Sequence, residues 1–317
     1  FQVWHERYPD LVFIASETKP YGTQKKEDYQ VISYEDNSWN NMHEFVAGQF
    51  IWAGIDYLGE SAGWPDRGLR HGLMHTNGFI KAHAWYIGSQ YREDPLVKLT
   101  VKDSLLADSL NKLNNWQVSW AGAPLVDHWS FEDDHSMKEL VVFTNCDRVE
   151  IQLNKNLIQT LQRSSFADGV IKASVAYKPG ELVARAFYTD DRGKTQVVSD
   201  TLRTSYRPYA LAMHPDRHKV DEDSRVVQIT TKVVDSVGTL HPHSSHLVNY
   251  QLDGPGKIKV IDNGDLADHT PNNASSKEVR KGKQLLVLQA GSEPGDLIVR
   301  ASADGLRPSQ VRIKSKE

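Results

Sequence analysis

The beginning of the chain alternates between short apolar runs and amphipathic stretches. Residues 10–15 and 49–53 are almost wholly apolar and are bounded by polar or turn-forming residues. Such short runs are typical of strands buried on both faces, as in a parallel sheet. The stretches 37–46 and 80–91 carry apolar side chains at helical spacing, and residues 1–4 read as the tail of a further helix. The pattern therefore predicts two β/α units, which cannot close a barrel or a sheet without neighbours.

From about Leu99 the apolar pattern changes to a period of two. Short runs between turn signals predict strands at 140–143, 149–153, 182–187, 226–234, 247–252, 256–261, 284–289 and 297–301. Strands of this length and spacing are typical of β-sandwiches, and the Tyr-Arg-Pro at 206–208 is a plausible boundary between two of them. We therefore predict three parts, residues 1–97, 98–206 and 207–317.

Composition narrows the class of protein and of partner. The 317 residues include 37 Lys and Arg against 41 Asp and Glu, a net charge of −4, without a basic stripe. We therefore expect no nucleic-acid partner. The mean hydropathy is −0.52 and no run of 18 apolar residues occurs, so no membrane span is expected. The single cysteine, Cys146, excludes a disulfide framework within the chain.

A carboxylate and an aromatic residue stand at the ends of the two predicted buried strands. Glu17 follows the run 10–15, and Trp52 lies at the end of the run 49–53, shortly before Asp56. The C-terminal ends of parallel barrel strands carry catalytic groups, and a carboxylate there can act as nucleophile, base or metal ligand. A tryptophan at that edge can stack on a sugar ring, although burial in a core is the commoner role of this residue.

Several segments resemble glycoside hydrolase family 2, and most closely in pattern the β-galactosidases of polysaccharide-degrading bacteria. The segments IASETKP, SYEDNSW, FVAGQFIWAGIDYLGES and GLMHTNGFIKAHAWY are similar to the end of the catalytic barrel in that family. VVFTNCDRVEIQLNKN and YKPGELVARAF resemble the sandwich that follows the barrel. KIKVIDNGDLADH and VRASADGL resemble the terminal immunoglobulin-like domain. The resemblance thus covers essentially the whole chain.

The resemblance implies a mixed fold. It comprises the C-terminal fragment of a (β/α)₈ barrel, with strands seven and eight and their helices, followed by two all-β immunoglobulin-like sandwiches. It implies part of a retaining exo-β-glycosidase, most closely a β-galactosidase, which hydrolyses terminal β-galactosides through a covalent glycosyl-enzyme intermediate. The expected partners are a β-galactoside-containing oligosaccharide or polysaccharide and the N-terminal remainder of the enzyme. No cofactor or metal is implied, and a periplasmic or secreted location in a bacterium is expected.

Residue roles are carried over from the family by position. Glu17 matches the nucleophile after strand seven, and Trp52 matches the aromatic residue after strand eight that lines the sugar pocket. The acid/base glutamate of the family follows strand four, which would precede Phe1, so the isolated chain is expected to be inactive. The substrate-binding candidates are Trp52, Asp56, Trp64, Arg67 and His75. Asp56 lies in the loop beyond strand eight, where a structural or rim role is expected. The segment that contains His75 departs from the common family pattern, which leaves the preferred sugar open.

The sequence also allows other interpretations. The chain could belong to a carbohydrate-binding or adhesion protein with a non-catalytic barrel remnant, or to a β-glucuronidase or β-mannosidase. The histidines at 241, 243 and 246 could form a metal clip, but the lack of a fourth ligand favours a solvated loop. The Asp-Asn-Gly-Asp at 262–265 lacks the twelve-residue calcium pattern and predicts a turn. Neither sandwich shows an exposed aromatic row, so no glycan-binding role is predicted for them.

Overall fold

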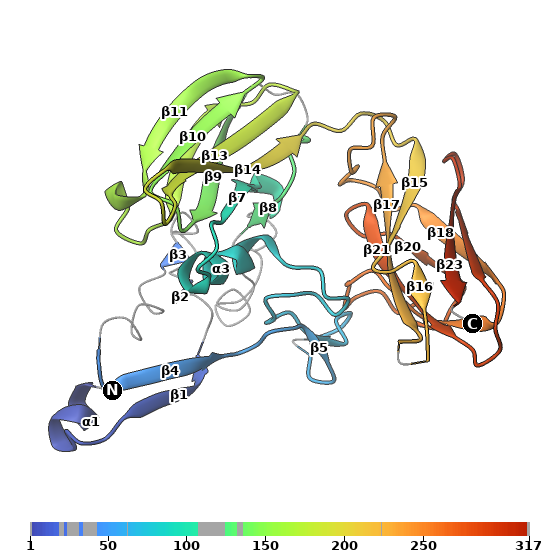
Figure 1. The fold of residues 1–317 in the computed structure, drawn as a ribbon, viewed down its shortest axis with the longest axis horizontal. Coiled ribbons are helices and arrows are strands. Elements are labelled where there is room, and N and C mark those ends of the chain that lie inside the picture. Colours follow the sequence, from blue (N-terminus) through green and yellow to red (C-terminus); the bar gives the residue numbers. More distant parts are fainter. Residues whose placement is uncertain are drawn as a thin grey trace. The chain divides into compact units, whose positions relative to one another are not determined.

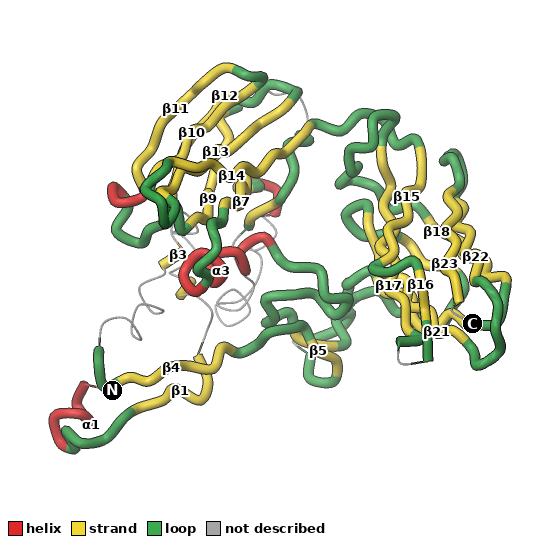
Figure 2. Tube along the Cα trace, in the orientation of Figure 1, coloured by secondary structure: helices red, strands yellow, loops and turns green. Residues whose placement is uncertain are grey.

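The protein is described by a computed structural model that covers residues 2–18, 22–23, 32–33, 43–61, 63–106, 124–131, 136–222 and 224–315. Most regular structure in these residues is β (Figures 1 and 2). The chain forms two compact units. The first consists of Phe1–Ala62, Gly68–His75 and Ile80–Leu202, and the second of Gly63–Arg67, Thr76–Phe79 and Arg203–Glu317. The division of the sequence into three parts stays a prediction.

The two strands predicted near the N-terminus pair with each other. β1 (Phe13–Thr18) and β4 (Val46–Ile51) are parallel, with Ala15 opposite Gln49, and they lie side by side in Figure 1. Helix α1 (Gln2–Arg7) precedes them and confirms the predicted helix tail. Burial on both faces, however, was the wrong prediction for this chain. Ile14 is 58% and Phe50 is 68% exposed, because no other element among the described residues joins their two-stranded sheet.

Of the two helices predicted beside these strands, one is confirmed and the other has a wrong C-terminal end. The helix expected over 37–46 lies mostly outside the described residues, and its C-terminal end is wrong. Val46 begins β4, because it pairs with Phe13 across the sheet. The helix expected over 80–91 is confirmed as the 3₁₀ turn η3 (Ala82–Ala84) followed by α3 (Trp85–Tyr91), whose Tyr86 is buried against Phe143. The short paired strands in this part are β2 (Gly22–Thr23), β3 (Ile32–Ser33), β5 (Tyr57–Leu58) and β6 (Gly68–Leu69).

The remainder of the first unit is a sandwich of two four-stranded sheets, ordered β11-β10-β13-β14 and β12-β9-β7-β8. Its strands are β7 (Val97–Lys102), β8 (Leu125–Val126), β9 (Met137–Thr144), β10 (Arg148–Leu153), β11 (Asn156–Gln162), β12 (Ile171–Ala176), β13 (Glu181–Thr189) and β14 (Thr195–Arg203). Alternate side chains of both sheets, including Leu99, Ile151 and Leu182, are fully buried in one core. This period-two burial confirms the predicted sandwich.

The second unit contains another sandwich, with sheets ordered β15-β17-β21-β19 and β16-β23-β22-β18-β20. Its strands are β15 (Ala210–Pro215), β16 (Lys219–Val220), β17 (Val226–Val234), β18 (Leu247–Asp253), β19 (Gly256–Asp262), β20 (Ser276–Glu278), β21 (Lys283–Ala290), β22 (Leu297–Ser302) and β23 (Ser309–Ser315). Ile229, Leu286 and Val299 come from both sheets and meet in a core of their own. Each sandwich therefore has a separate hydrophobic core.

Candidate functional site

Glu17 and Trp52 lie at the same end of the parallel strand pair. The backbone N–H of Trp52 donates to the carbonyl of Thr18 at 2.8 Å, and the hydroxyl of Thr18 donates to the carbonyl of Phe50 at 3.3 Å. These bonds keep the C-terminal ends of β1 and β4 joined. Glu17 is exposed at that edge. The structure thus brings together the two residues that the sequence placed at the ends of neighbouring strands.

The indole of Trp52 is fixed by aromatic neighbours and remains accessible. Its Nε1 donates to the hydroxyl of Tyr57 at 3.3 Å, and the two rings meet edge to face with centroids 5.7 Å apart. Tyr57 in turn meets the ring of His71 edge to face at 6.4 Å. Edge-to-face contacts of this kind orient aromatic rings. Because Trp52 is still 41% exposed, its ring can accept a flat apolar partner from solvent.

Asp56 is the centre of a buried charge network. Its side chain is almost fully buried, and Oδ1 accepts hydrogen bonds from Nζ of Lys81 at 2.6 Å and from the N–H of Gly72 at 2.9 Å. Its Oδ2 lies 3.3 Å from Nδ1 of His75. Lys81 also donates to the carbonyl of Arg70 at 2.9 Å. Both carboxylate oxygens are therefore engaged within the protein.

The backbone that carries this network is closely packed. The segment 53–56 runs beside 71–74, joined by bonds such as that from the N–H of Asp56 to the carbonyl of Met74 at 2.9 Å. A Cβ on Gly72 would lie 2.2 Å from the amide nitrogen of Asp56, a distance that no side chain tolerates. Only glycine at position 72 lets the two segments come close enough for its N–H to donate a hydrogen bond to the Asp56 carboxylate.

Electrostatics keep Asp56 ionised. Burial alone would raise the pKa of this carboxyl group. The hydrogen bond with His75 and the positive charge of Lys81 outweigh that effect, so the pKa of Asp56 lies below its usual value. His75 is 22% exposed at its side chain, whereas Asp56 is 1% exposed. The network can therefore orient the imidazole of His75, which offers the more accessible polar atoms of this pair.

The other two candidates from the sequence belong to the second unit. Trp64 is 84% exposed, and its indole stacks on the ring of His269 with centroids 4.5 Å apart. The backbone N–H of Arg67 donates to the carbonyl of Leu266 at 3.1 Å. Glu17, Trp52, Asp56 and His75 belong to the first unit. The assignment of all six to substrate chemistry stays a prediction.

Lys81 is a residue that the sequence did not single out. Its only signal was a charged residue in a largely apolar stretch before α3, and a lysine in such a place is commonly solvated.

Among the described residues no group of three or more His, Cys, Asp or Glu side chains could hold a metal ion. Within the same ranges no helix is long and apolar enough to cross a membrane.

Two family models match the sandwich regions of the chain. Residues 211–312 match "Glycoside hydrolase family 2 C-terminal domain 5". Residues 135–193 match a domain of unknown function, DUF4982. The first match coincides with the sandwich of the second unit, and the second lies within the sandwich of the first unit.

Curated relatives extend the similarity over nearly the whole chain. β-Galactosidase BoGH2A of Bacteroides ovatus is 25% identical over 323 residues, covering 99% of this chain and 33% of that protein. A β-glucuronidase of Formosa agariphila is 26% identical over 335 residues, covering 98% of this chain and 32% of that protein. The chain therefore spans about a third of the length of these relatives.

Solved structures show the same fold. A glycosyl hydrolase family 2 member from Bacteroides cellulosilyticus matches all of this chain and 41% of its own chain, with a TM-score of 0.81 at 22% identity. A β-glycosidase from Bacteroides vulgatus matches 99% of this chain and 43% of its own, with a TM-score of 0.80 at 20% identity. Residues 211–312 thus match the C-terminal domain of glycoside hydrolase family 2, and nearly the whole chain is similar to the C-terminal part of glycosidases of that family.

Proposed function

We propose that this chain forms the end of the catalytic barrel and the C-terminal domains of a retaining exo-β-glycosidase that acts on terminal β-galactosides. The observation that carries the proposal is the common edge of Glu17 and Trp52. β1 and β4 are parallel, and the bond between Trp52 and Thr18 holds their C-terminal ends together. This is the arrangement expected of strands seven and eight in a (β/α)₈ barrel, where catalytic groups lie at the C-terminal ends of the strands.

In this mechanism the carboxylate of Glu17 attacks the anomeric carbon and forms a glycosyl ester, while the glycosidic C–O bond breaks. A second carboxyl group, supplied by the rest of the enzyme about 5–5.5 Å away, protonates the leaving oxygen. The same group then removes a proton from the water that hydrolyses the ester, and free sugar is released. No metal is required for either step.

Trp52, His75 and Asp56 position the sugar in this proposal. The exposed indole of Trp52 stacks on the apolar face of the ring. The imidazole of His75 hydrogen-bonds a sugar hydroxyl, and Asp56 acts through His75 as a positioning residue, because its own oxygens are engaged by Lys81 and Gly72. Substitution of Asp56 should therefore change KM through the orientation of His75.

β-Glucuronide hydrolysis is the second candidate activity. It is favoured by the β-glucuronidase of Formosa agariphila, whose identity to this chain matches that of the β-galactosidase over an equal share of the sequence. Both activities use the same nucleophile chemistry, and their sugars differ in the configuration at C4 and in the group at C5. Parallel assays with aryl β-galactoside and aryl β-glucuronide decide between them.

The test uses the full-length enzyme that contains this chain. Glu17→Gln removes the attacking carboxylate, and we expect kcat/KM to fall by at least about three orders of magnitude. Glu44→Gln, which changes an exposed glutamate just before β4, is the matched control and should retain activity. A mechanism-based fluorosugar should label Glu17. Labelling of another carboxylate would refute the assignment.

Without the second carboxyl group the 317-residue chain alone should not turn over an aryl β-galactoside, because general acid catalysis is worth about 10²–10⁴-fold and most of the sugar pocket is absent. We also propose a periplasmic or secreted location, which fits an enzyme that meets polysaccharides. Fractionation of the native host with an antibody against this chain would test the location.

A further inference from the structure

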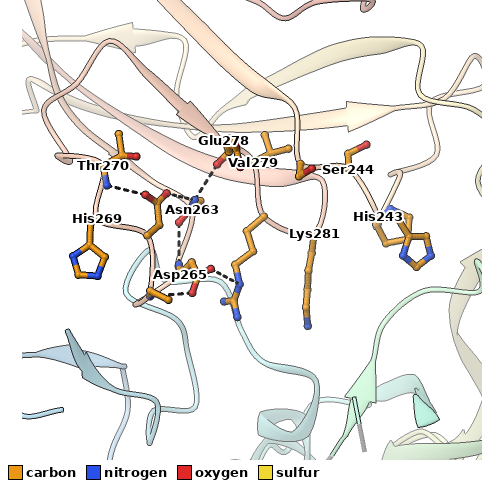
Figure 3. Close-up of a pocket in the computed structure, with 14 residues that line it drawn as sticks. His243, Ser244, Asn263, Asp265, His269, Thr270, Glu278, Val279 and Lys281 are labelled. Carbon is orange, nitrogen blue, oxygen red and sulfur yellow. Dashed lines mark hydrogen bonds and ion pairs between the residues drawn. The ribbon is translucent and has the colours of Figure 1, made fainter. Parts of the chain in front are cut away.

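A polar groove of about 680 Å³ lies on the C-terminal sandwich, within the second unit. Three segments line it, at 242–245, 263–270 and 278–281. Figure 3 shows the side chains of His269, Lys281 and His243 spread along it and pointing to the same side, with Asp265 between them. Neither the hydrolytic mechanism nor the family comparison assigns a role to this groove.

The walls of the groove are held in place before any ligand binds. The side-chain amide of Asn263 donates to the carbonyl of Glu278 at 2.9 Å and to the carboxylate of Asp268 at 2.7 Å. The guanidinium of Arg280 donates to the carbonyl of Gly264 at 2.9 Å. These bonds join the second and third segments. A site that is already ordered loses little conformational entropy when a ligand binds.

A buried lysine anchors the segment that ends the groove. Lys277 is fully buried, and its ammonium donates to the carbonyl of Thr270 at 2.9 Å and to the side chain of Asn272 at 3.1 Å. Asp268 lies 3.7 Å from the same ammonium. A buried ammonium needs such partners. Lys277 therefore holds the loop on both sides of His269, at Asp268 and at Thr270.

An aromatic platform adjoins this end of the groove. Nε2 of His269 lies 2.8 Å from the carbonyl of Pro65, and the His269 ring stacks on Trp64 at 4.5 Å and 30°. One face of the indole is thus in contact with His269, whereas 84% of Trp64 remains exposed. Trp64 and His269 are about 200 positions apart in the sequence. The pattern of aromatic residues along the chain therefore could not predict that their rings stack.

The combination of platform and lining indicates the chemical class of the ligand. A sugar ring has an apolar face that stacks on an indole and a rim of hydroxyls that bond with carboxylates, amides and cations. The lining carries carboxylates on Asp265, Asp268 and Glu278 beside the cations of Arg280 and Lys281, and Asp265 lies 3.7 Å from Arg280. The three carboxylates outnumber these two cations, so the lining favours a neutral ligand over an anion.

We propose that this groove binds a neutral glycan, with one sugar ring on the free face of Trp64 and the following sugars along the polar lining. This is a binding function of the C-terminal sandwich that goes beyond hydrolysis. It refines the predicted role of Trp64 from a substrate contact at the barrel mouth to a glycan platform on the second unit. Binding is measured without turnover, so its failure and the failure of the proposed hydrolysis are distinguishable.

The test is isothermal titration calorimetry of the 317-residue chain with β-1,4-galactotetraose, cellotetraose and, as the anionic alternative, tetragalacturonate. We expect at least one neutral tetrasaccharide to bind and tetragalacturonate to bind more weakly. Absence of binding by both neutral tetrasaccharides at millimolar concentration would overturn the proposal. Tighter binding of tetragalacturonate would overturn the choice of a neutral ligand.

Variants locate the binding. Trp64→Ala should weaken binding about three- to tenfold, as the loss of one aromatic stacking contact predicts, and Trp64→Phe should recover part of the loss. Tyr206→Ala, at another exposed aromatic residue of the same unit, 68% exposed, is the matched control and should bind as the unchanged chain does. Because Trp64 is so exposed, its removal should leave the fold intact. Equal affinity in Trp64→Ala would exclude the platform.

A second variant tests the lining without touching the platform. Glu278 contributes its carbonyl to the fold, whereas its side chain is exposed in the groove. Glu278→Gln keeps that carbonyl and removes a charged acceptor, so we expect about two- to tenfold weaker binding of the neutral glycan. Unchanged affinity in both Glu278→Gln and Trp64→Ala would place any observed binding elsewhere on the chain.

Discussion

The ammonium of Lys81 lies 2.6 Å from Oδ1 of Asp56, and both side chains are almost completely buried. Removing one partner of such a pair leaves an uncompensated charge in the interior, which costs roughly 3–5 kcal/mol. The pair also supports the two neighbours of Asp56, because Gly72 and His75 contact the same carboxylate. Lys81 therefore stabilises the loop that holds the candidate sugar-binding histidine.

Lys81→Gln should loosen this loop locally. The chain has two compact units, and a single unfolding free energy is poorly defined for such a protein, so the readout is amide hydrogen exchange over residues 71–75. We expect the opening free energy there to fall by about 3–5 kcal/mol. Lys172→Gln is the control, because its pair with Asp168 at 2.8 Å is 39% exposed at the lysine and exposed pairs contribute about 0–1 kcal/mol. Equal effects of the two substitutions would contradict the prediction.

The pH dependence of this loop follows from the lowered pKa of Asp56. A carboxyl group whose pKa is lower in the folded state stabilises the fold above its unfolded pKa, and that stabilisation is lost as the pH falls through the folded value. The unfolded reference is 3.8. The amide proton of Gly72, which donates to this carboxylate, should therefore change its chemical shift with a midpoint below 3.8 as the pH falls. Asp56→Asn should abolish the transition, and a midpoint above 3.8 would show that burial outweighs Lys81 and His75.

Gly72 should tolerate no side chain. A methyl group there would lie 2.2 Å from the backbone of both Ile55 and Asp56, so the two segments must separate. Gly72→Ala should destabilise the loop by at least about 1–3 kcal/mol and expose it to thermolysin. Gly54→Ala provides the matched control, because nothing lies within 4 Å of its added Cβ. If both variants resist thermolysin equally, the close approach of 53–56 to 71–74 is not needed.

The sequence predicted those elements whose stability comes from a local pattern. β17 begins at Val226 and ends at Val234 as the alternation indicated, because each second side chain faces a core of the sandwich. The helix expected up to Val46 failed because a long-range partner, Phe13, recruits that residue into β4. Helical periodicity depends only on residues that are close in the sequence, so it cannot predict the pairing of two distant segments.

In the candidate site, too, local features could be predicted from the sequence and long-range contacts could not. The positions of Glu17 and Trp52 followed from the ends of two strands, which is a local signal. The pairing of Asp56 with Lys81 joins residues 25 positions apart, and the stacking of Trp64 on His269 joins two distant segments. Nothing in the spacing of these residues encodes either contact, because it depends on how the intervening loops fold.

The loop at 262–270 is held by its own hydrogen bonds and by segments that lie much earlier in the chain. Besides its own turn bonds, such as that from the N–H of Gly264 to Asp262 at 2.7 Å, this loop contacts two segments from the first eighty residues. Leu266 accepts from the N–H of Arg67 at 3.1 Å, and the carbonyl of Asp262 accepts from the side chain of Asn77 at 3.2 Å. The core of the sandwich, in contrast, is built from residues after 210.

A chain shortened to residues 203–317 should therefore fold but lose order at this loop. We expect amide exchange in β17 and β21 to match that of the 317-residue chain, because their core is complete. Exchange over 262–270 should become at least about tenfold faster, as the loss of the three hydrogen bonds to Pro65, Arg67 and Asn77, of about 0.5–1.5 kcal/mol each, predicts. The comparison within one molecule is its own control, since strands and loop experience the same solvent. Uniformly fast exchange would mean that the sandwich does not fold alone. An unchanged loop would mean that its turn bonds suffice and that the segments around Arg67 and Asn77 contribute nothing to its order.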